Sequence, residues 1–323
     1  MNPAENRSLP GTDRTLSPIG LGTWQFSSGR GTLGGHWDPL SDETMRAVVD
    51  AALENGIDWF DTAEAYGDGA SEENLSRALQ ACGVAPGAVT IADKWWPKER
   101  RAASLVETID ERLRRLAPYP IDLYQIHWPE SKSWLRTEMN ALATLVERGK
   151  VRSVGLCNYS GKLIRRAAKW LRRRDVPLAS IQVRYSLLYR FVETNGVLDA
   201  AKELGLAVIA WSPLEQGLLT GRFHDDPASM DGLKEGRRKM FGIEPARVEA
   251  TAPLIASLRR IGERHEATPA QVALAWLVQF HGDLVFAIPG ASNPKQATEN
   301  AGAMRLTLSA EELRELDERS RSF

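Results

Sequence analysis

Cysteine is scarce in this chain of 323 residues, which contains only Cys82 and Cys157. Two thiols are too few to form a disulfide scaffold in a chain of this length. The five histidines are scattered, without the HExxH or paired-histidine spacing of common metal enzymes. We therefore expect a reducing compartment and no metal centre.

Long apolar runs and an excess of charge of one sign are also missing. No segment approaches the ~20 apolar residues that a membrane-spanning helix requires, and the first fifteen residues lack the apolar core of a signal peptide. The 41 basic side chains are balanced by 42 acidic ones, whereas a nucleic-acid-binding protein normally carries a basic surplus. We expect a cytoplasmic protein that binds neither a membrane nor nucleic acid.

Two clusters of arginines stand out against this balance: Arg112 with Arg114 and Arg115, and the run from Arg172 to Arg174. Both clusters fall near the ends of predicted helices. Cations are favourable there because they complement the negative end of the helix dipole. We expect both clusters to be solvent-exposed helix ends.

Short apolar segments alternate with amphipathic helical segments over nearly the whole chain, which is the pattern of a parallel sheet built from strand–helix units. Eight strands are predicted, at residues 19–24, 57–61, 89–94, 122–127, 152–157, 180–183, 207–210 and 285–288. Helices are predicted at residues 42–54, 71–81, 104–116, 134–148, 161–174, 193–204 and 269–280. This alternation predicts an α/β fold, a (β/α)8 or TIM barrel, with residues 1–323 as a single domain.

Two stretches between these elements are long and rich in glycine. Residues 26–40 follow the first strand, and residues 213–245 follow the seventh. Irregular segments of this length are uncommon unless they form lids or binding loops. Because both follow barrel strands, we expect them to border the C-terminal mouth of the barrel.

Polar side chains stand at the ends of three consecutive apolar strands. Asp61 ends the second strand, Lys94 the third and His127 the fourth, while Tyr66 lies in the loop just after Asp61. Each alone has a structural explanation: a turn-forming aspartate, a tyrosine in packing, a lysine that reaches solvent or a hydrogen-bonded core histidine. The carboxyl ends of barrel strands meet at one mouth, so their conjunction favours a common active site.

These four side chains are suited to deliver a proton. A phenol has an ordinary pKa of about 10, and an ammonium nearby, held by a carboxylate, lowers that pKa toward the working range. Tyr66 would then act as a general acid, with Lys94 and Asp61 behind it. His127 would donate a hydrogen bond to a substrate carbonyl. Because no side chain carries a hydride, a nicotinamide cofactor is required for reduction.

Five motifs resemble the aldo-keto reductase superfamily: GLGTW at residues 20–24, FDTAEAYG at 60–67, DLYQIHWP at 122–129, GKVRSVG at 149–155 and IPGA at 288–291. They lie in the family's order and span nearly the whole chain. Further motifs resemble the branch of bacterial and plastid general reductases, pyridoxal reductases and potassium-channel β-subunits: NYS at 158–160, YSLLYR at 185–190, WSPL at 211–214 and GLLTG at 217–221.

The resemblance implies reversible, NADPH-dependent reduction of aldehydes and ketones, with Asp61, Tyr66, Lys94 and His127 as the catalytic tetrad. It also implies NADPH bound in extended form, and no GxGxxG lies at a strand-to-helix turn here. The cofactor-binding residues implied by the resemblance are Thr23, Trp24, Asp61, Asn158, Gln182, Trp211, Ser212, Leu214, Arg222, Gly290, Ser292, Gln296, Glu299 and Asn300. Among them, Asn158 and Gln182 would hold the nicotinamide amide, and Trp211 would stack on its ring.

One departure concerns the loop that holds the 2′-phosphate of NADPH. Many relatives have Arg or Lys soon after the Pro-Gly of this loop, whereas this chain has Ser292 there. Lys295 and a basic cluster in the long loop are the candidate substitutes, the cluster being Lys234, Arg237, Arg238 and Lys239. These charges would otherwise be ordinary solvated loop charges.

The substrate is expected to be a small aromatic or apolar carbonyl compound, because aromatic residues should border the mouth: Trp24, Phe26, Trp37, Trp95, Trp96, Trp128 and Trp134. Two other functions are open. One is a cofactor-binding, redox-sensing regulatory subunit with little catalysis, against which His127 argues. The other is a Schiff-base aldolase with Lys94 as nucleophile, which Asp61 disfavours because an ion pair keeps the amine protonated.

Overall fold

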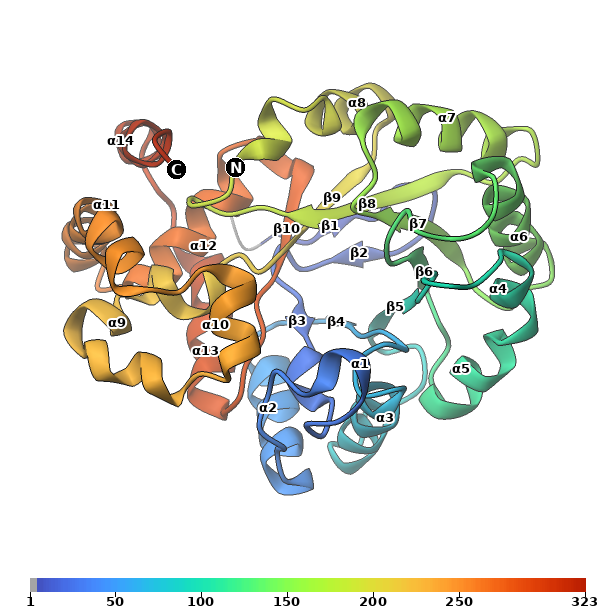
Figure 1. The fold of residues 1–323 in the computed structure, drawn as a ribbon, viewed down its shortest axis with the longest axis horizontal. Coiled ribbons are helices and arrows are strands. Elements are labelled where there is room, and N and C mark those ends of the chain that lie inside the picture. Colours follow the sequence, from blue (N-terminus) through green and yellow to red (C-terminus); the bar gives the residue numbers. More distant parts are fainter. Residues whose placement is uncertain (1–4) are drawn as a thin grey trace.

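Eight parallel strands form the centre of the computed structural model, which describes residues 5–323 (Figure 1). Residues 1–4, which the predicted domain includes, lie outside this range. The strands are β3 (Leu21–Gly22), β4 (Trp59–Asp61), β5 (Thr90–Trp95), β6 (Leu123–Ile126), β7 (Ser153–Cys157), β8 (Leu178–Arg184), β9 (Ala207–Trp211) and β10 (Val285–Ile288). Each pairs in parallel with the next, and bridges from Ile19 to Ala287 and from Gly22 to Gly290 close the ring. The predicted barrel is confirmed.

Helices surround this barrel on the outside (Figure 1). The main ones are α2 (Asp42–Glu54), α3 (Ala70–Ala81), α4 (Ala103–Glu107), α5 (Ile109–Leu116), α6 (Leu135–Glu147), α7 (Gly161–Arg172), α8 (Val197–Leu204), α11 (Pro245–Arg264), α12 (Pro269–Gln279), α13 (Pro294–Gly302) and α14 (Ala310–Ser320). Two predicted helices differ: residues 104–116 are divided at Thr108 into α4 and α5, and in residues 193–204 the 3₁₀ helix η2 (Phe191–Glu193) ends before α8 begins at Val197. The predicted set lacked α11, α13 and α14.

The longer glycine-rich stretch, residues 213–245, is not irregular, so that expectation is wrong. Residues 213–245 contain the 3₁₀ helices η3 (Glu215–Thr220) and η4 (Pro227–Gly232) and the α-helices α9 (Arg222–Asp225) and α10 (Glu235–Phe241). The earlier stretch, residues 26–40, begins at the end of η1 (Trp24–Phe26) and is irregular except for the short helix α1 (Gly31–Gly34). Helices of three to seven residues are too short to show a full apolar period, which is why the sequence pattern missed them.

An N-terminal hairpin packs against the barrel interior. Its strands, β1 (Arg7–Ser8) and β2 (Thr15–Leu16), pair antiparallel. Leu16 is buried in a cluster that includes Trp59 and Phe286 from two barrel strands. The buried guanidinium of Arg7 donates hydrogen bonds to the carbonyl oxygens of Val285 and Val278, both at 2.8 Å. The first described residues thus complete the core of the barrel.

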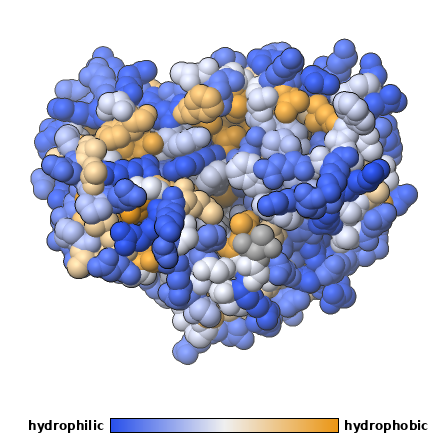
Figure 2. Space-filling view, in the orientation of Figure 1, coloured by the Kyte–Doolittle hydropathy of each residue, from blue (hydrophilic) through white to orange (hydrophobic). Residues whose placement is uncertain are grey.

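Within residues 5–323, no helix is both long enough and apolar enough to cross a membrane. The face seen in Figure 2 is mostly hydrophilic, with apolar side chains showing around the hollow near its centre.

Candidate active site

A cavity of about 840 Å³ occupies the C-terminal mouth of the barrel. It is lined by strand ends, by the two glycine-rich stretches and by residues 288–300. Asp61, Tyr66 and His127 are among the lining residues, while Lys94 lies fully buried against Asp61. The four side chains predicted from the strand ends are therefore brought together.

Lys94 is held in place by its neighbours. Its ammonium donates hydrogen bonds to the carboxylate of Asp61 and, at 2.8 Å, to the carbonyl oxygen of Thr62. The other carboxylate oxygen of Asp61 accepts a hydrogen bond from Gln182 at 2.8 Å. Burial lowers the pKa of Lys94, but the adjacent Asp61 carboxylate more than reverses this, so the pKa lies above its ordinary value. Lys94 is therefore an ammonium at neutral pH and a poor nucleophile, which counts against the aldolase alternative.

Tyr66 lies beside this ion pair, with the Lys94 nitrogen 5.0 Å from the centroid of its ring. Burial raises the pKa of Tyr66 to about 12, and Lys94 only partly opposes it. The expectation that Lys94 brings this pKa below its ordinary value is thus wrong, because the cost of burying a phenolate is larger than the stabilisation by Lys94. The phenol keeps its proton at neutral pH, which is the state that a proton donor requires.

His127 faces both Tyr66 and the cavity wall. Its ring lies edge-on to Tyr66, with centroids 5.6 Å apart, and edge-on to Trp96 at 5.2 Å. Burial, together with the charge of Lys94, holds the pKa of His127 well below its ordinary value. Its Nδ1 has no hydrogen-bond partner among residues 5–323. A neutral imidazole can donate one hydrogen bond to a ligand in the cavity.

All of the residues that the resemblance assigned to cofactor binding line this cavity, namely Thr23, Trp24, Asp61, Asn158, Gln182, Trp211, Ser212, Leu214, Arg222, Gly290, Ser292, Gln296, Glu299 and Asn300. Several are fixed by contacts with the protein. Asn158 donates to the carbonyl oxygen of His127 and accepts from the indole N–H of Trp211, both at 3.0 Å. Gln296 accepts a hydrogen bond from the backbone N–H of Ser292 at 2.8 Å.

Two guanidinium groups in the cavity, those of Arg222 and Arg237, form no ion pair with a carboxylate in the part of the chain that the structure describes. Arg237 is buried and stacks on Trp37, 3.9 Å from the ring centroid, and its Nε has no hydrogen-bond partner among the described residues. Burial and the nearby cation Arg222 lower the pKa of Arg237 to about 10, although the carboxylate of Asp38 partly opposes them. Neither arginine forms an ion pair within residues 5–323. Such cations fit an anionic ligand.

The other members of the predicted basic cluster are paired with carboxylates. The ammonium of Lys234 pairs with the carboxylate of Asp38 at 2.5 Å, and this ion pair joins the start of α10 to the first glycine-rich stretch. Arg238 pairs with Asp231, and Lys239 pairs with Glu235. Lys295 lines the cavity. Arg237 is the member of the cluster with the clearest capacity to bind a phosphate.

Four of the seven predicted aromatic wall residues line the cavity: Trp24, Trp37, Trp96 and Trp128. The other three do not, so that part of the prediction is wrong. Phe26 and Trp95 are buried in the core, and Trp134 is 86% exposed outside the cavity. Sequence analysis missed His36, whose ring lies 5.6 Å from Trp24, because it had no partner at a recognisable spacing.

The outer side of β5 carries a separate group of buried charges. Asp93 and Glu72 are both fully buried, and neither carboxylate has a hydrogen-bond partner of ordinary geometry among the described residues. Burial raises the pKa of Asp93 to about 6, and burial and Asp93 together raise that of Glu72 well above its ordinary value. Arg112 pairs with Glu72 at 3.2 Å and is itself only 5% exposed, so its prediction as a solvated helix end is wrong.

Comparison with known proteins places the chain among oxidoreductases. The chain is 37% identical to an uncharacterized oxidoreductase of Mycobacterium tuberculosis over 95% of this chain and 90% of that protein. The structure resembles the glycerol dehydrogenase of Gluconobacter oxydans, with a TM-score of 0.79, 28% identity and coverage of 99% and 95% of the two chains. It also resembles an aldo-keto reductase from Klebsiella pneumoniae in complex with NADPH, with a TM-score of 0.71, 26% identity and coverage of 94% and 91%.

A model of the Aldo/keto reductase family matches residues 18–321. The fold, the site at the mouth of the barrel and these comparisons agree. The chain is an oxidoreductase and belongs to the aldo/keto reductase family.

Proposed function

We propose that this protein is an NADPH-dependent carbonyl reductase that converts aldehydes and ketones to alcohols in a reversible reaction. The observation that supports this most directly is the Lys94–Asp61 ion pair beneath a protonated Tyr66, with a neutral His127 at its side. A bound nicotinamide cofactor supplies the hydride.

Each of the four side chains has a distinct role in this proposal. His127 donates a hydrogen bond to the substrate carbonyl and orients it. Tyr66 transfers its phenolic proton to the substrate oxygen as negative charge develops there. The ammonium of Lys94 stabilises the phenolate that remains, and Asp61 keeps Lys94 charged and in position.

NADPH is the proposed cofactor because the cavity offers unpaired cations for phosphate groups. Arg222 and Arg237 are the proposed phosphate ligands, and Arg237 compensates for Ser292 in the loop after β10. The related Klebsiella pneumoniae structure holds NADPH, which supports the same choice. Asn158, Gln182 and Trp211 would surround the nicotinamide, while the residues of 290–300 would hold the adenosine end.

The substrate class and the branch are further parts of this proposal. The four tryptophans that line the cavity favour an aromatic or apolar carbonyl compound. The motifs at residues 185–190 and 211–221 support the branch of bacterial and plastid general reductases, pyridoxal reductases and potassium-channel β-subunits. We further propose that residues 1–323 form a single domain.

The experiment is a reductase assay with the purified protein. NADPH absorbance is followed with a panel of aromatic and aliphatic aldehydes and ketones that includes pyridoxal. We expect turnover with at least one aromatic aldehyde and at least ~10-fold tighter binding of NADPH than of NADH, about 1.4 kcal/mol. Equal affinity for the two cofactors would contradict the NADPH assignment. Tight NADPH binding without turnover of any carbonyl would instead favour the regulatory subunit.

A further inference from the structure

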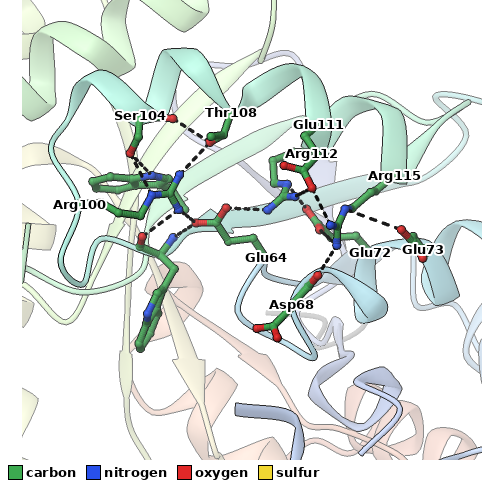
Figure 3. A network of polar contacts seen from close by, with 12 residues as sticks. Glu64, Asp68, Glu72, Glu73, Arg100, Ser104, Thr108, Glu111, Arg112 and Arg115 are labelled. Atoms are coloured by element: carbon green, nitrogen blue, oxygen red, sulfur yellow. Dashed lines mark hydrogen bonds and ion pairs between the residues drawn. The ribbon is translucent and has the colours of Figure 1, made fainter. Parts of the chain in front are cut away.

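Glu64 occupies a place in the active-site loop that the proposed chemistry does not use. It lies between Asp61 and Tyr66 in the chain, and its side chain is only 6% exposed. Its backbone N–H donates a hydrogen bond to the carbonyl oxygen of Lys94 at 3.2 Å. Its carboxylate lies between the guanidinium groups of Arg100 and Arg112 and accepts hydrogen bonds from both (Figure 3).

The carboxylate of Glu64 has three donors. One oxygen accepts hydrogen bonds from the backbone N–H of Trp96 and from the guanidinium of Arg100. The other oxygen accepts from Arg112 on α5 at 2.6 Å. Two guanidinium groups and a backbone amide therefore converge on a single buried carboxylate, and charge-assisted hydrogen bonds of this kind have well-defined geometry.

These contacts connect two loops that carry active-site groups. Glu64 is two residues from Tyr66, and a turn hydrogen bond from the Tyr66 N–H to the Ala63 carbonyl at 3.0 Å keeps this segment compact. On the other side, the ring of Trp96 packs edge-on against His127, which in turn packs against Tyr66. A continuous series of contacts therefore joins these residues: Glu64 is hydrogen-bonded to Trp96, the Trp96 ring packs on His127, and His127 packs on Tyr66, which follows Glu64 in the chain.

We propose that Glu64 is a positioning residue that fixes the distance between the phenol of Tyr66 and the imidazole of His127 by tying the Tyr66 loop to the Trp96 loop. The inference rests on the proposed reductase function. A small displacement of either group lowers the rate of proton transfer, since a misplacement of ~1 Å can cost on the order of 100-fold in rate. Arg112 and Arg100 hold the carboxylate of Glu64 in place.

The test compares Glu64→Gln with a matched control, Glu72→Gln. The glutamine at position 64 keeps an oxygen for the Trp96 N–H, but its amide group faces a guanidinium and loses the ion pair. Glu72 is also fully buried and pairs with the same Arg112, yet its carboxylate accepts no hydrogen bond from Trp96 or from any other described residue. A purely structural network would make the two variants behave alike.

For Glu64→Gln we expect kcat for aldehyde reduction to fall by about 10- to 100-fold, with the Kd of NADPH changed less than about twofold. The kinetic isotope effects from deuterated NADPH and from deuterated solvent should increase, because a misplaced donor makes the chemical step more rate-limiting. Glu72→Gln should change the melting temperature but leave kcat and both isotope effects as in the wild type. Arg100→Met, at a side chain 27% exposed, should show a smaller effect in the same direction as Glu64→Gln, and serves if that variant does not fold.

A crystal structure of the Glu64→Gln protein gives a readout that does not depend on turnover. We expect the segment around Trp96 to shift and the centroids of Tyr66 and His127 to lie at a distance different from 5.6 Å. Unchanged ring positions, or wild-type isotope effects in both Glu64→Gln and Arg100→Met, would overturn the inference. An inactive wild-type protein would refute the reductase proposal, and the ring positions would still decide the role of Glu64.

Discussion

Asp93 should make the stability of this protein fall as the pH rises from about 4 to 6. Asp93 lies in β5, and its carboxyl is fully buried on the outer side of this strand, next to Glu72. Burial raises its pKa from 3.8 to about 6. Because the folded state holds this proton more tightly than the unfolded state, unfolding releases it between these two pH values. The free energy of unfolding therefore decreases as pH increases through this range.

The size of this effect follows from the two pKa values. A difference of about two pKa units corresponds to about 3 kcal/mol at a pH above both values. Asp93→Asn removes the titration, and the asparagine amide can donate a hydrogen bond to Glu72. We expect the variant to be more stable than the wild type at pH 7.5 by up to this amount, and the advantage to shrink toward pH 4.5.

Calorimetric melting temperatures at several pH values between 4.5 and 7.5 measure this difference. With an unfolding entropy of about 2.1 cal/mol/K per residue, about 3 kcal/mol corresponds to roughly 4 °C in a chain of this length. Asp231→Asn, at an exposed side chain, controls for the substitution itself. A difference in melting temperature that does not change with pH, or that grows toward acidic pH, would refute the reasoning.

Three other expectations concern the active site. Tyr66→Phe should lower kcat by on the order of 100-fold or more and leave the Kd of NADPH, measured by fluorescence, nearly unchanged. Lys94→Met should have the same effects. Retained activity of the Tyr66→Phe variant would contradict the proposed proton donor. Arg237→Met should weaken NADPH binding by at least about tenfold in a fluorescence titration. The control Lys239→Met, at an exposed lysine paired with a carboxylate, should leave NADPH binding unchanged. Equal effects of the two substitutions would contradict the phosphate role of Arg237. Because the pKa of Tyr66 is about 12, the proton donor for reduction should remain protonated between pH 6 and 9. Alcohol oxidation with NADP+ needs the phenolate, so its rate should increase with pH. Profiles of kcat/KM against pH in both directions measure this, and an oxidation rate that falls from pH 7 to 10 would contradict it.

The barrel and the meeting of Asp61, Lys94 and His127 could be predicted because buried parallel strands are distinct apolar runs, and their polar last residues share one mouth. It was harder to predict whether a strand residue points into the barrel or outward toward the helices. Side chains alternate along a strand, so Lys94 points into the barrel while Asp93 and Trp95 point outward, toward the helices. Applying this alternation to β5 would have removed Trp95 from the predicted wall.

The errors at Arg112 and in the second glycine-rich stretch have different causes. Burial of Arg112 depends on carboxylates from α3 and from the loop after β4, which lie 40 and 48 residues away in the chain, so local helix patterns carry no sign of it. The short helices of residues 213–245 are stabilised by contacts with other parts of the fold rather than by their own periodicity. The local sequence likewise could not predict that Arg237 lacks an ion pair, because this depends on which of the neighbouring cations pair with carboxylates in the folded protein.

Closure of the barrel has a consequence for synthesis on the ribosome. The backbone N–H of Gly20 donates to Ala287 at 2.9 Å, and that of Ala287 donates to Pro18 at 3.0 Å, so the first barrel strand pairs with the last. During translation, the edge of β3 and the edge of the growing sheet have no strand partner until β10 has left the ribosome. Such exposed edges invite association with other nascent chains, and contacts so distant in sequence form slowly. Premature termination before β10 should therefore yield an open, aggregation-prone product.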